Sequence, residues 1–390
     1  MTKTVIYPDN ETNLELYEKL DSDEILVYDE KGIIQTSMQK TNNLEDFSNA
    51  DAIIFTQNCI INGKYDTTNL KQACNKLQNL VLDEVLLIFD TRVPPRTVLK
   101  MSKIIDEYEL IPDIKLAYTT TINNNIRVCA GKNEECLEKL VKLYTPISEE
   151  IKTVKHIQTA EIIPILQNAY KDTLIALANQ TAILSEALTV DLIEAIDVAN
   201  FDSEINLLYP QPVLKNEIIR DSDEINKLAD EYGEPSQLSE NTRSTNNYVA
   251  YHMAYMAEKE LYLKEHLAMF ETTVAILGVT NDETLLNEED NASLMLIDDF
   301  ASRDVTVWVH DDKIPEEIIE EHGAKKVTLE EAYDADCLII MTDTPEYRNI
   351  KPENIQKVLI TALPLFNLED FKDVEFSSVG QYRLKEGEML

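Results

Sequence analysis

The chain of 390 residues is 44% hydrophobic, which is enough for two or three domains with sizeable cores and excludes an intrinsically disordered protein. Its formal net charge of −37 disfavours nucleic acid and anionic membrane surfaces as partners, because both attract basic patches. We interpret the acidic excess as an adaptation for solubility, with an acidic docking face as the alternative.

Cysteine and histidine usage gives no metal-binding pattern. The 5 cysteines and 5 histidines lack the spacing of a metal motif, and no CxxC occurs, so we expect no metal site. The first residues, MTKTVIYPDNE, contain no apolar signal core, and no apolar run is long enough to cross a membrane. These features predict a cytoplasmic, reduced protein.

Residues 1–157 alternate predicted strands and helices. Strands are expected at 4–7, 24–28, 51–56, 84–89 and 114–118, and helices at 13–20 and near 69–80. Continuous apolar strands separated by helices predict a parallel sheet that is covered on both faces, and the order is compatible with a Rossmann-type domain.

The first turn of this domain is unusual for a dinucleotide site. Such a turn normally contains closely spaced glycines, whereas this one reads YPDNETN, and the whole chain has only 8 glycines. The carboxylates of Asp9 and Glu11 would repel a pyrophosphate. Asp29, which follows the second strand, is a candidate for a ribose hydroxyl, although a strand-end Asp is more often a simple turn residue.

The middle of the chain is predicted to be helical. Apolar residues recur at helical spacing from 159 onward, which predicts one helix of about 25 to 30 residues followed by a shorter one. Residues 201–235 read as polar and irregular, and a second long helix is expected at 236–263. The Met and Tyr residues along that helix are interpreted as core or interface.

Residues 271–390 return to alternating strands and helices. Strands are expected at 273–278, 305–309, 335–341 and 357–361, with helices near 291–302 and 316–321. The sequence therefore predicts an α/β protein with two Rossmann-like parallel-sheet domains, at 1–157 and 271–390. A long central helix and a helical dimerisation region at 158–270 join them.

Four strings, in a fixed order along the chain, resemble the UDP-glucose/GDP-mannose dehydrogenase family. They are NLEDFSNADAII at 43–54, DTRVPPRT at 90–97, the run from Ala160-Glu161 to Gln180, and ADCLIIMTDTPEY at 335–347. The resemblance covers most of the chain. It implies an NAD-binding domain, a dimerising helical linker and a C-terminal domain that binds a UDP-sugar.

The resemblance also implies a four-electron oxidation through a catalytic cysteine, and the chain departs from that pattern. The cysteine position falls on Glu217, in a loop that reads VLKNEIIRD, and no cysteine lies between Cys136 and Cys337. The family's helix lysine falls on Pro164, and its water-handling glutamate falls on Thr121. The family's helix asparagine and water-activating aspartate are retained as Asn168 and Asp221.

Two further positions concern the sugar nucleotide. In the family a lysine and an arginine bind it, and here these positions fall on Asp282 and Glu289. Two cations beside an anionic ligand have thus become two anions, so the resemblance implies that this substrate-binding pair is lost.

The missing groups lead to a main hypothesis and two alternatives. The main one is a non-catalytic relative without a cofactor, which keeps the dimeric scaffold for a structural, partnering or regulatory role, with an active paralogue as one such partner. The first alternative is an NAD-dependent oxidoreductase acting on a CH–OH group with altered chemistry, in which Asp29 holds the ribose and Asp221 is the base. The second is a ligand sensor that uses its acidic clefts. In each case we expect a homodimer through the central helices.

Overall fold

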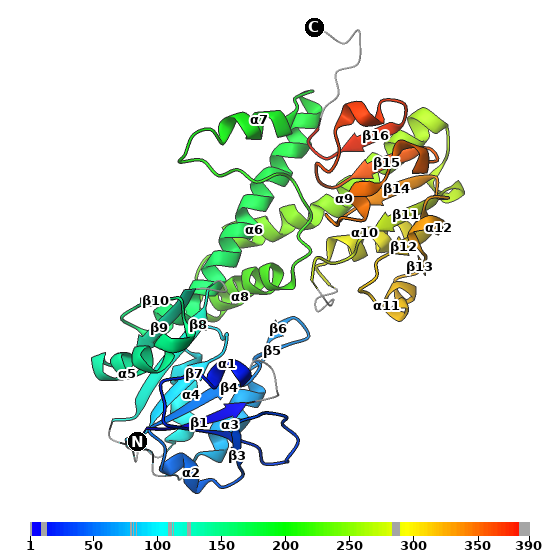
Figure 1. Ribbon diagram of the computed structural model, residues 1–390. Helices are drawn as coiled ribbons and strands as arrows, with labels where there is room; N and C mark the ends of the chain where they lie inside the picture. Colours follow the sequence, from blue (N-terminus) through cyan, green and yellow to red (C-terminus); the bar gives the residue numbers. More distant parts are fainter. Residues whose placement is uncertain are drawn as a thin grey trace. The chain divides into compact units, whose positions relative to one another are not determined.

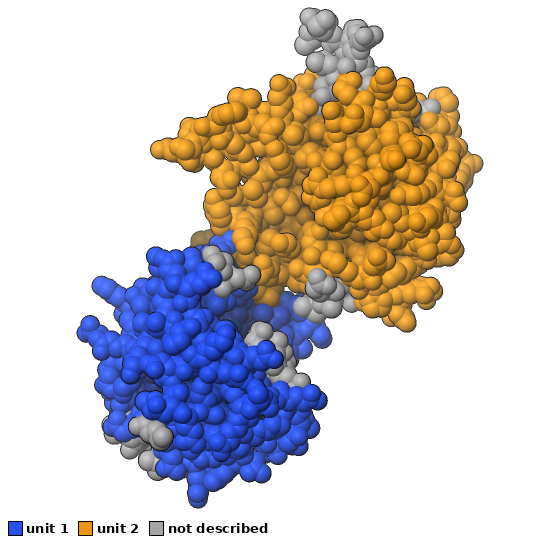
Figure 2. Space-filling model, in the orientation of Figure 1, with its two compact units in different colours: residues 1–167 blue, residues 168–390 orange. Residues whose placement is uncertain are grey.

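The computed structural model describes residues 2–8, 14–78, 80, 82, 84–107, 111, 113–122, 126–282 and 289–381. It divides into two compact units, residues 1–167 and 168–390, which Figure 2 distinguishes by colour. The division falls inside one long helix, α6 (Ile157–Ala187). The predicted division into three domains at 157 and 270 stays a prediction.

The first unit contains a sheet of eight strands in the order β10-β9-β8-β7-β4-β1-β2-β3 (Figure 1). The strands are β1 (Lys3–Pro8), β2 (Glu24–Tyr28), β3 (Gln39–Thr41), β4 (Ala52–Thr56), β7 (Leu86–Asp90), β8 (Lys115–Thr121), β9 (Ile126–Gly131) and β10 (Glu150–Thr153). Neighbours from β3 to β8 are parallel, in the strand order of a dinucleotide-binding fold. The parallel-sheet prediction is confirmed there, but β9 pairs antiparallel with β8 and was missed.

Both faces of this sheet are buried, as the continuous apolar strands predicted. Successive residues point to opposite faces, so Val5 packs into one core and Ile6 into the other. The helices of this unit are α1 (Leu14–Tyr17), α2 (Glu45–Ser48), α3 (Thr68–Lys76), α4 (Thr97–Ile105) and α5 (Glu134–Tyr144), and a small hairpin joins β5 (Ile60–Ile61) to β6 (Lys64–Tyr65).

The second unit contains a six-stranded sheet in the order β13-β12-β11-β14-β15-β16, parallel throughout. The strands are β11 (Thr273–Leu277), β12 (Thr306–His310), β13 (Lys325–Lys326), β14 (Cys337–Ile340), β15 (Val358–Thr361) and β16 (Glu375–Ser378), and the helices that follow them are α10 (Ala292–Ala301), α11 (Glu316–Glu321) and α12 (Leu329–Ala332). The second Rossmann-like sheet is therefore confirmed.

The residue that follows β11 in this sheet must be glycine for a steric reason. Gly278 has φ +92° directly after β11, and a Cβ atom there would lie 1.9 Å from Thr342 Oγ1. The ends of β11 and β14 therefore approach each other closely only because residue 278 has no side chain.

Of the remaining helices of the second unit, one is short and two are long. They are α7 (Leu192–Ala199), α8 (Asn216–Tyr232) and α9 (Gln237–Glu265). Short 3-10 turns occur in the first unit at Thr145–Ile147 and in the second at Met269–Glu271, Tyr347–Asn349, Pro352–Asn354 and Leu368–Phe371. The predicted long helices correspond to α6 and α9. Among the described residues, no helix is both long and apolar enough to cross a membrane.

The prediction of irregular structure over 201–235 holds for 201–215 but is wrong for most of the rest, because it overlooked α8. Its apolar residues Ile218 and Ile219 pack with Ile175 of α6, and Gly233 ends the helix in a left-handed conformation. The charged residues of this amphipathic helix are divided between a buried set, Arg220, Asp221 and Glu224, and exposed positions such as Lys227 and Asp230, so the high charge did not indicate a loop.

Helices α6 and α9 are also joined by buried polar groups. Asn179 Nδ2 donates to Asn246 Oδ1 at 2.9 Å, and Asn246 Nδ2 donates to Asp172 Oδ1 at 2.7 Å. Arg243 Nη1 donates to the same Asp172 oxygen at 3.1 Å. All four side chains are buried, so this ladder fixes the register of the two helices.

Candidate active site

The retained asparagine and aspartate lie together in the second unit. Asn168, from α6, donates from Nδ2 to Asp221 Oδ2 of α8 at 2.6 Å. Arg220 donates from Nε to the other carboxylate oxygen, Oδ1, at 2.8 Å. Asp221 is fully buried, and a guanidinium and an amide are among the groups that bond its carboxylate. The structure thus brings together two groups that the sequence placed 53 residues apart.

A lysine that the sequence analysis did not consider reaches the same pair. Lys171 Nζ donates to Asn168 Oδ1 at 3.3 Å, and the lysine is itself exposed. Residues three positions apart share one face of a helix, so the spacing of Asn168 and Lys171 was the available signal. An exposed ammonium, an amide and a buried carboxylate therefore follow one another from solvent inward.

The other positions implied by the resemblance do not supply replacement chemistry. Pro164 is buried within α6, one turn before Asn168, and offers no polar side chain. Thr121 is an exposed residue at the end of β8. Glu217 lies in the first turn of α8, where its carbonyl oxygen accepts from Asn168 Nδ2 at 3.4 Å.

The acidic residues at the expected substrate-binding positions have different surroundings. Asp282 Oδ2 accepts the backbone N–H of Asn216 at 2.7 Å, at the N-terminus of α8. A carboxylate is favourable there because the first N–H groups of a helix lack partners within the helix. Glu289 is exposed before α10. Asp282 therefore caps the N-terminus of α8. Its alignment with the lysine position of the family did not suggest this role.

The first unit has a pocket of about 190 Å³ where β1, β2 and β4 end. It is lined by residues that include Pro8, Asp29, Gln57 and Lys76. In open α/β sheets, ligands bind at the carboxyl ends of the strands next to the point where strand order reverses, and β1 and β4 flank that point here. Asp9 and Glu11, which the sequence analysis singled out in the first turn, lie outside the described residues.

Asp29 lies in this pocket and also supports the local backbone. Its carboxylate accepts the N–H groups of Ile33 and Ile34 at 3.1 and 3.0 Å and the Lys40 ammonium at 3.1 Å. Burial acts to raise the pKa of Asp29, but these hydrogen bonds outweigh it and hold the pKa below the ordinary value. The position fits the predicted ribose contact, although the turn role accounts for most of its bonding.

Glu161, in the family-like Ala160-Glu161 pair, caps a helix of the first unit. Its two oxygens accept the backbone N–H groups of Arg96 at 2.5 Å and Val98 at 2.8 Å, at the start of α4. Burial raises the pKa of Glu161 to about 7, while the bonds from Val98 and Arg96 oppose the rise. The motif residue is therefore structural in this environment.

None of the five cysteines is placed as a nucleophile. All five are free and buried. Burial raises the pKa of Cys129 to about 11 and shifts Cys74, Cys136 and Cys337 in the same direction. Buried thiols in such surroundings stay protonated and inert.

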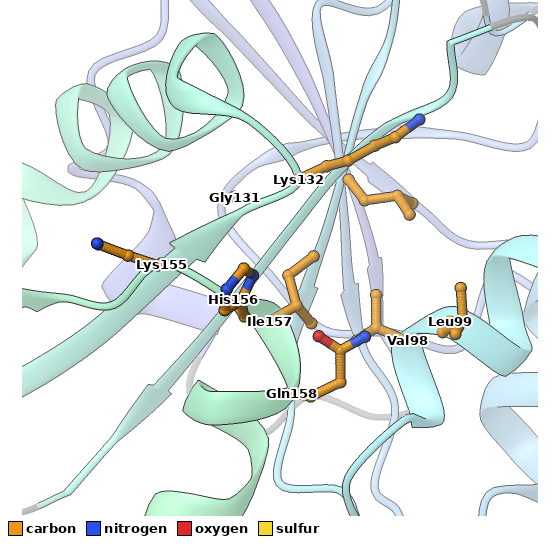
Figure 3. Close-up of a pocket in the computed structure, with 9 residues that line it drawn as sticks. Val98, Leu99, Gly131, Lys132, Lys155, His156, Ile157 and Gln158 are labelled. Atoms are coloured by element: carbon orange, nitrogen blue, oxygen red, sulfur yellow. The ribbon is translucent and has the colours of Figure 1, made fainter.

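A second pocket of the first unit, of about 220 Å³, is shown in Figure 3. Val98, Ile157 and Gln158 line its centre, and the side chains of Lys132 and Lys155 extend away from it in different directions. Lys132 Nζ instead bonds Asp113 at 2.8 Å. The pocket contains none of the predicted site residues, and we assign it no ligand.

Comparison with known proteins identifies two matching regions. Residues 158–248 match the central domain of the UDP-glucose/GDP-mannose dehydrogenase family, and residues 275–371 match the UDP binding domain of that family. The UDP-N-acetyl-D-mannosamine dehydrogenase of Methanococcus vannielii is 23% identical over 300 residues, which cover 76% of this chain and 68% of that protein. The enzyme of the same name from Methanococcus aeolicus is 24% identical over 311 residues, covering 76% and 67%.

Solved structures share the fold. The NDP-N-acetyl-D-galactosaminuronic acid dehydrogenase of Methanosarcina mazei aligns with a TM-score of 0.82 at 17% identity, over 98% of this chain and 96% of that one. The UDP-D-ManNAc dehydrogenase of Pyrococcus horikoshii aligns with a TM-score of 0.77 at 19% identity, over 97% and 99%. These likenesses concern the architecture alone.

The comparisons contradict the main hypothesis drawn from the sequence, a non-catalytic relative. Relatives that align over 76% of the chain are named dehydrogenases. The hypothesis counted lost groups one by one, and it gave no weight to the cluster that Asn168, Asp221 and Lys171 form in the fold. The expectation that no cofactor binds rested on the same reasoning and is not supported either.

The two matched regions are consecutive in the chain, and the two sheets and the long helices between them have the architecture of these dehydrogenases. The chain therefore belongs to the UDP-glucose/GDP-mannose dehydrogenase family.

Proposed function

We propose that the chain is an NAD-dependent oxidoreductase that oxidises an alcohol of a nucleotide sugar to an aldehyde by two electrons. The observation that carries the proposal is the 2.6 Å bond between Asn168 and Asp221, in a chain whose relatives are named UDP-sugar dehydrogenases. A buried carboxylate next to a polar helix face is suited to accept a proton.

The residues around this bond suggest a division of roles. Lys171 is a donor that can hold the alcohol oxygen as negative charge develops on it, while the Asn168 amide bonds Asp221 and the Glu217 carbonyl oxygen. Asp221 is the final acceptor of the hydroxyl proton, directly or through one water molecule. Arg220 positions that carboxylate by bonding its second oxygen.

The cofactor is assigned to the pocket at the ends of β1, β2 and β4. Asp29 lines it, and the carboxylate oxygens have lone pairs beyond those used by Ile33, Ile34 and Lys40, so they can accept ribose hydroxyls. Bound NAD would supply the hydride acceptor for the reaction. The overall balance is RCH₂OH + NAD⁺ giving RCHO + NADH + H⁺.

The proposal stops at the aldehyde because the further oxidation requires a thiolate. Conversion of an aldehyde to an acid through a thioester needs an accessible cysteine, whereas all five thiols are buried. The expected product therefore differs from the acid that the family resemblance implies.

The test measures NADH formation with UDP-N-acetylmannosamine, UDP-N-acetylglucosamine and UDP-glucose, with hydroxylamine present to trap an aldehyde. We expect about one NADH per trapped product, and Asp221→Asn should lower kcat by roughly 10²- to 10⁴-fold. Asp230→Asn, an exposed change on the same helix, is the matched control and should leave kcat unchanged. Absence of NADH with every substrate, or an acid formed with about two NADH, would contradict the proposal.

A further inference from the structure

Three side chains able to ligate a metal converge on the second sheet. They are His310 at the end of β12, Asp312 two residues later, and Glu346 in the segment after β14, and one ligand atom of each lies within 4.8 Å of the other two. They line a cavity of about 440 Å³. Its lining residues come from the ends of β12, β13 and α11 and from nearby segments. The cavity lies where β12 ends, the edge at which open α/β sheets bind ligands.

The hydrogen bonds of His310 fix which ring nitrogen faces the cavity. Tyr347 donates its only hydroxyl proton to the His310 carbonyl oxygen at 3.0 Å. The same hydroxyl lies 2.9 Å from His310 Nδ1 and can accept a proton from that nitrogen when the ring carries its hydrogen there. In this neutral tautomer Nε2 has a lone pair, which is the arrangement of a metal-binding histidine with a hydrogen-bonded outer partner.

That lone pair has no hydrogen-bond partner among the described residues. Asp312 Oδ1 is 3.9 Å from Nε2, which is too far for a hydrogen bond. His310 as a whole residue is only 6% exposed, and it lines the cavity. An imidazole nitrogen of a buried side chain, within 4.8 Å of two carboxylate oxygens, is the second observation, besides the acidic residues, that indicates a cation.

The backbone positions of the three residues are well supported. Asp311, between two of them, accepts the N–H groups of Val279 at 2.7 Å and Lys313 at 2.8 Å, which fixes the segment after β12. Glu346 adjoins Tyr347, whose ring is buried and bonded to His310. The carboxylates of Asp312 and Glu346 are exposed and can shift by about an ångström to reach metal–ligand distances near 2 Å.

The charge of the cavity favours a cation over an anion. Its lining includes the carboxylates of Asp312, Glu316, Glu330, Glu331 and Glu346. Lys326 is the one lysine of the lining, and its ammonium already bonds the Ile314 carbonyl oxygen. Local electrostatic potential is therefore negative next to the imidazole.

We propose that His310 Nε2, Asp312 and Glu346 bind a divalent first-row transition ion such as Zn²⁺ or Mn²⁺. One imidazole with two carboxylates suits these ions, whereas Mg²⁺ and Ca²⁺ prefer oxygen ligands alone. The sequence analysis expected no metal because it considered Cys and His spacing, and here two of the three ligands are carboxylates, one of them distant in sequence. The proposed oxidation does not depend on this site.

The test is calorimetric titration of the metal-stripped full chain with ZnCl₂ and, separately, MnCl₂. We expect saturable binding of about one ion per chain. His310→Asn should weaken it by roughly 100-fold or more, and Tyr347→Phe, which removes only the outer partner, by about 10- to 100-fold. With Co²⁺, the visible absorption bands of the wild type should be absent in His310→Asn.

A matched control is provided by His322, which bonds Asp298 at 2.7 Å elsewhere in the same unit. His322→Asn should leave the titration unchanged. Because His310 is buried, Glu346→Gln serves as a second variant that changes only an exposed side chain. Equal affinity in wild type and Glu346→Gln, or equal losses in His310→Asn and His322→Asn, would overturn the proposal.

Discussion

At the scale of single residues, Glu161 gives the first unit a pH-dependent stability. Its pKa is about 7 in the fold, against an ordinary value of 4.5, because the carboxyl group is buried. Between these values the folded chain holds a proton that the unfolded chain has released. This contribution to stability is therefore present at low pH and is lost as pH rises through 7.

We predict that Glu161→Gln flattens this dependence. Between pH 4.5 and pH 8 the wild type should lose on the order of 3 kcal/mol more stability than the variant, in urea unfolding followed by circular dichroism. Glu138→Gln, an exposed change on α5, should retain the wild-type slope. Parallel slopes for wild type and Glu161→Gln would show that Glu161 is not the titrating group.

Some residue roles could be read from the sequence and others could not. Asn168 and Asp221 were identified through the resemblance, but their contact requires that α6 and α8 pack together. The capping roles of Asp282 and Glu161 depend on backbone N–H groups far along the chain, at Asn216 and at Val98. No local sequence pattern marks a distant backbone N–H group as the partner of a carboxylate. Asp282 was therefore interpreted as the replacement of a substrate-binding cation and not as a helix cap.

At the scale of elements, the ladder between α6 and α9 is the main polar feature. Asp172 is fully buried, and Arg243 supplies the cation that balances it. Removal of one partner from a buried ion pair leaves an uncompensated charge, which typically costs about 3–5 kcal/mol. The ladder is therefore a point where a single substitution should destabilise the second unit.

We predict that Arg243→Met lowers the stability of this unit by about 3–5 kcal/mol. Trp308 is the only tryptophan of the sequence and lies on β12, so its fluorescence during urea unfolding reports this unit. Lys139→Met removes an exposed i,i+4 pair with Glu135 and should change stability by less than about 0.5 kcal/mol. A loss below about 1 kcal/mol in Arg243→Met would contradict the reasoning.

Most long elements could be predicted, and the failures share a cause. Strands such as β2 and β14 are continuous apolar runs, and α6 has a clear helical period. The strand β9 was missed because its short apolar run contains one charged residue, Arg127, whose burial depends on an ion pair with Asp90 at 3.0 Å. Helix α8 was missed because its many charges concealed a narrow apolar face.

At the scale of the whole molecule, we propose that the chain is a homodimer through its long helices. Tyr170, Leu177, Leu184 and Leu188 follow one side of α6 and its C-terminal end, and each is between 47% and 59% exposed. On α9 the tyrosines Tyr248, Tyr251, Tyr255 and Tyr262 are likewise exposed. Aligned apolar side chains of this kind mark a protein interface.

We predict that the double change Leu177→Glu and Leu184→Glu shifts the mass measured by light scattering from dimer to monomer. Charges introduced into an apolar interface are strongly unfavourable, and the net charge of −37 adds repulsion between copies. Phe270→Glu, an exposed apolar residue outside α6 and α9, should not change the mass. A monomeric wild type at micromolar concentration would contradict the proposal.

Because all five thiols are buried, the chemical modification of each one reports local opening of the folded chain. Cys59, Cys74, Cys129 and Cys136 belong to residues 1–167, and Cys337 belongs to residues 168–390. An alkylating reagent can reach each sulfur only when the surrounding structure opens, so the rate of modification measures the free energy of that opening. Peptide mass spectrometry would then follow the opening of each unit separately, with no engineered label.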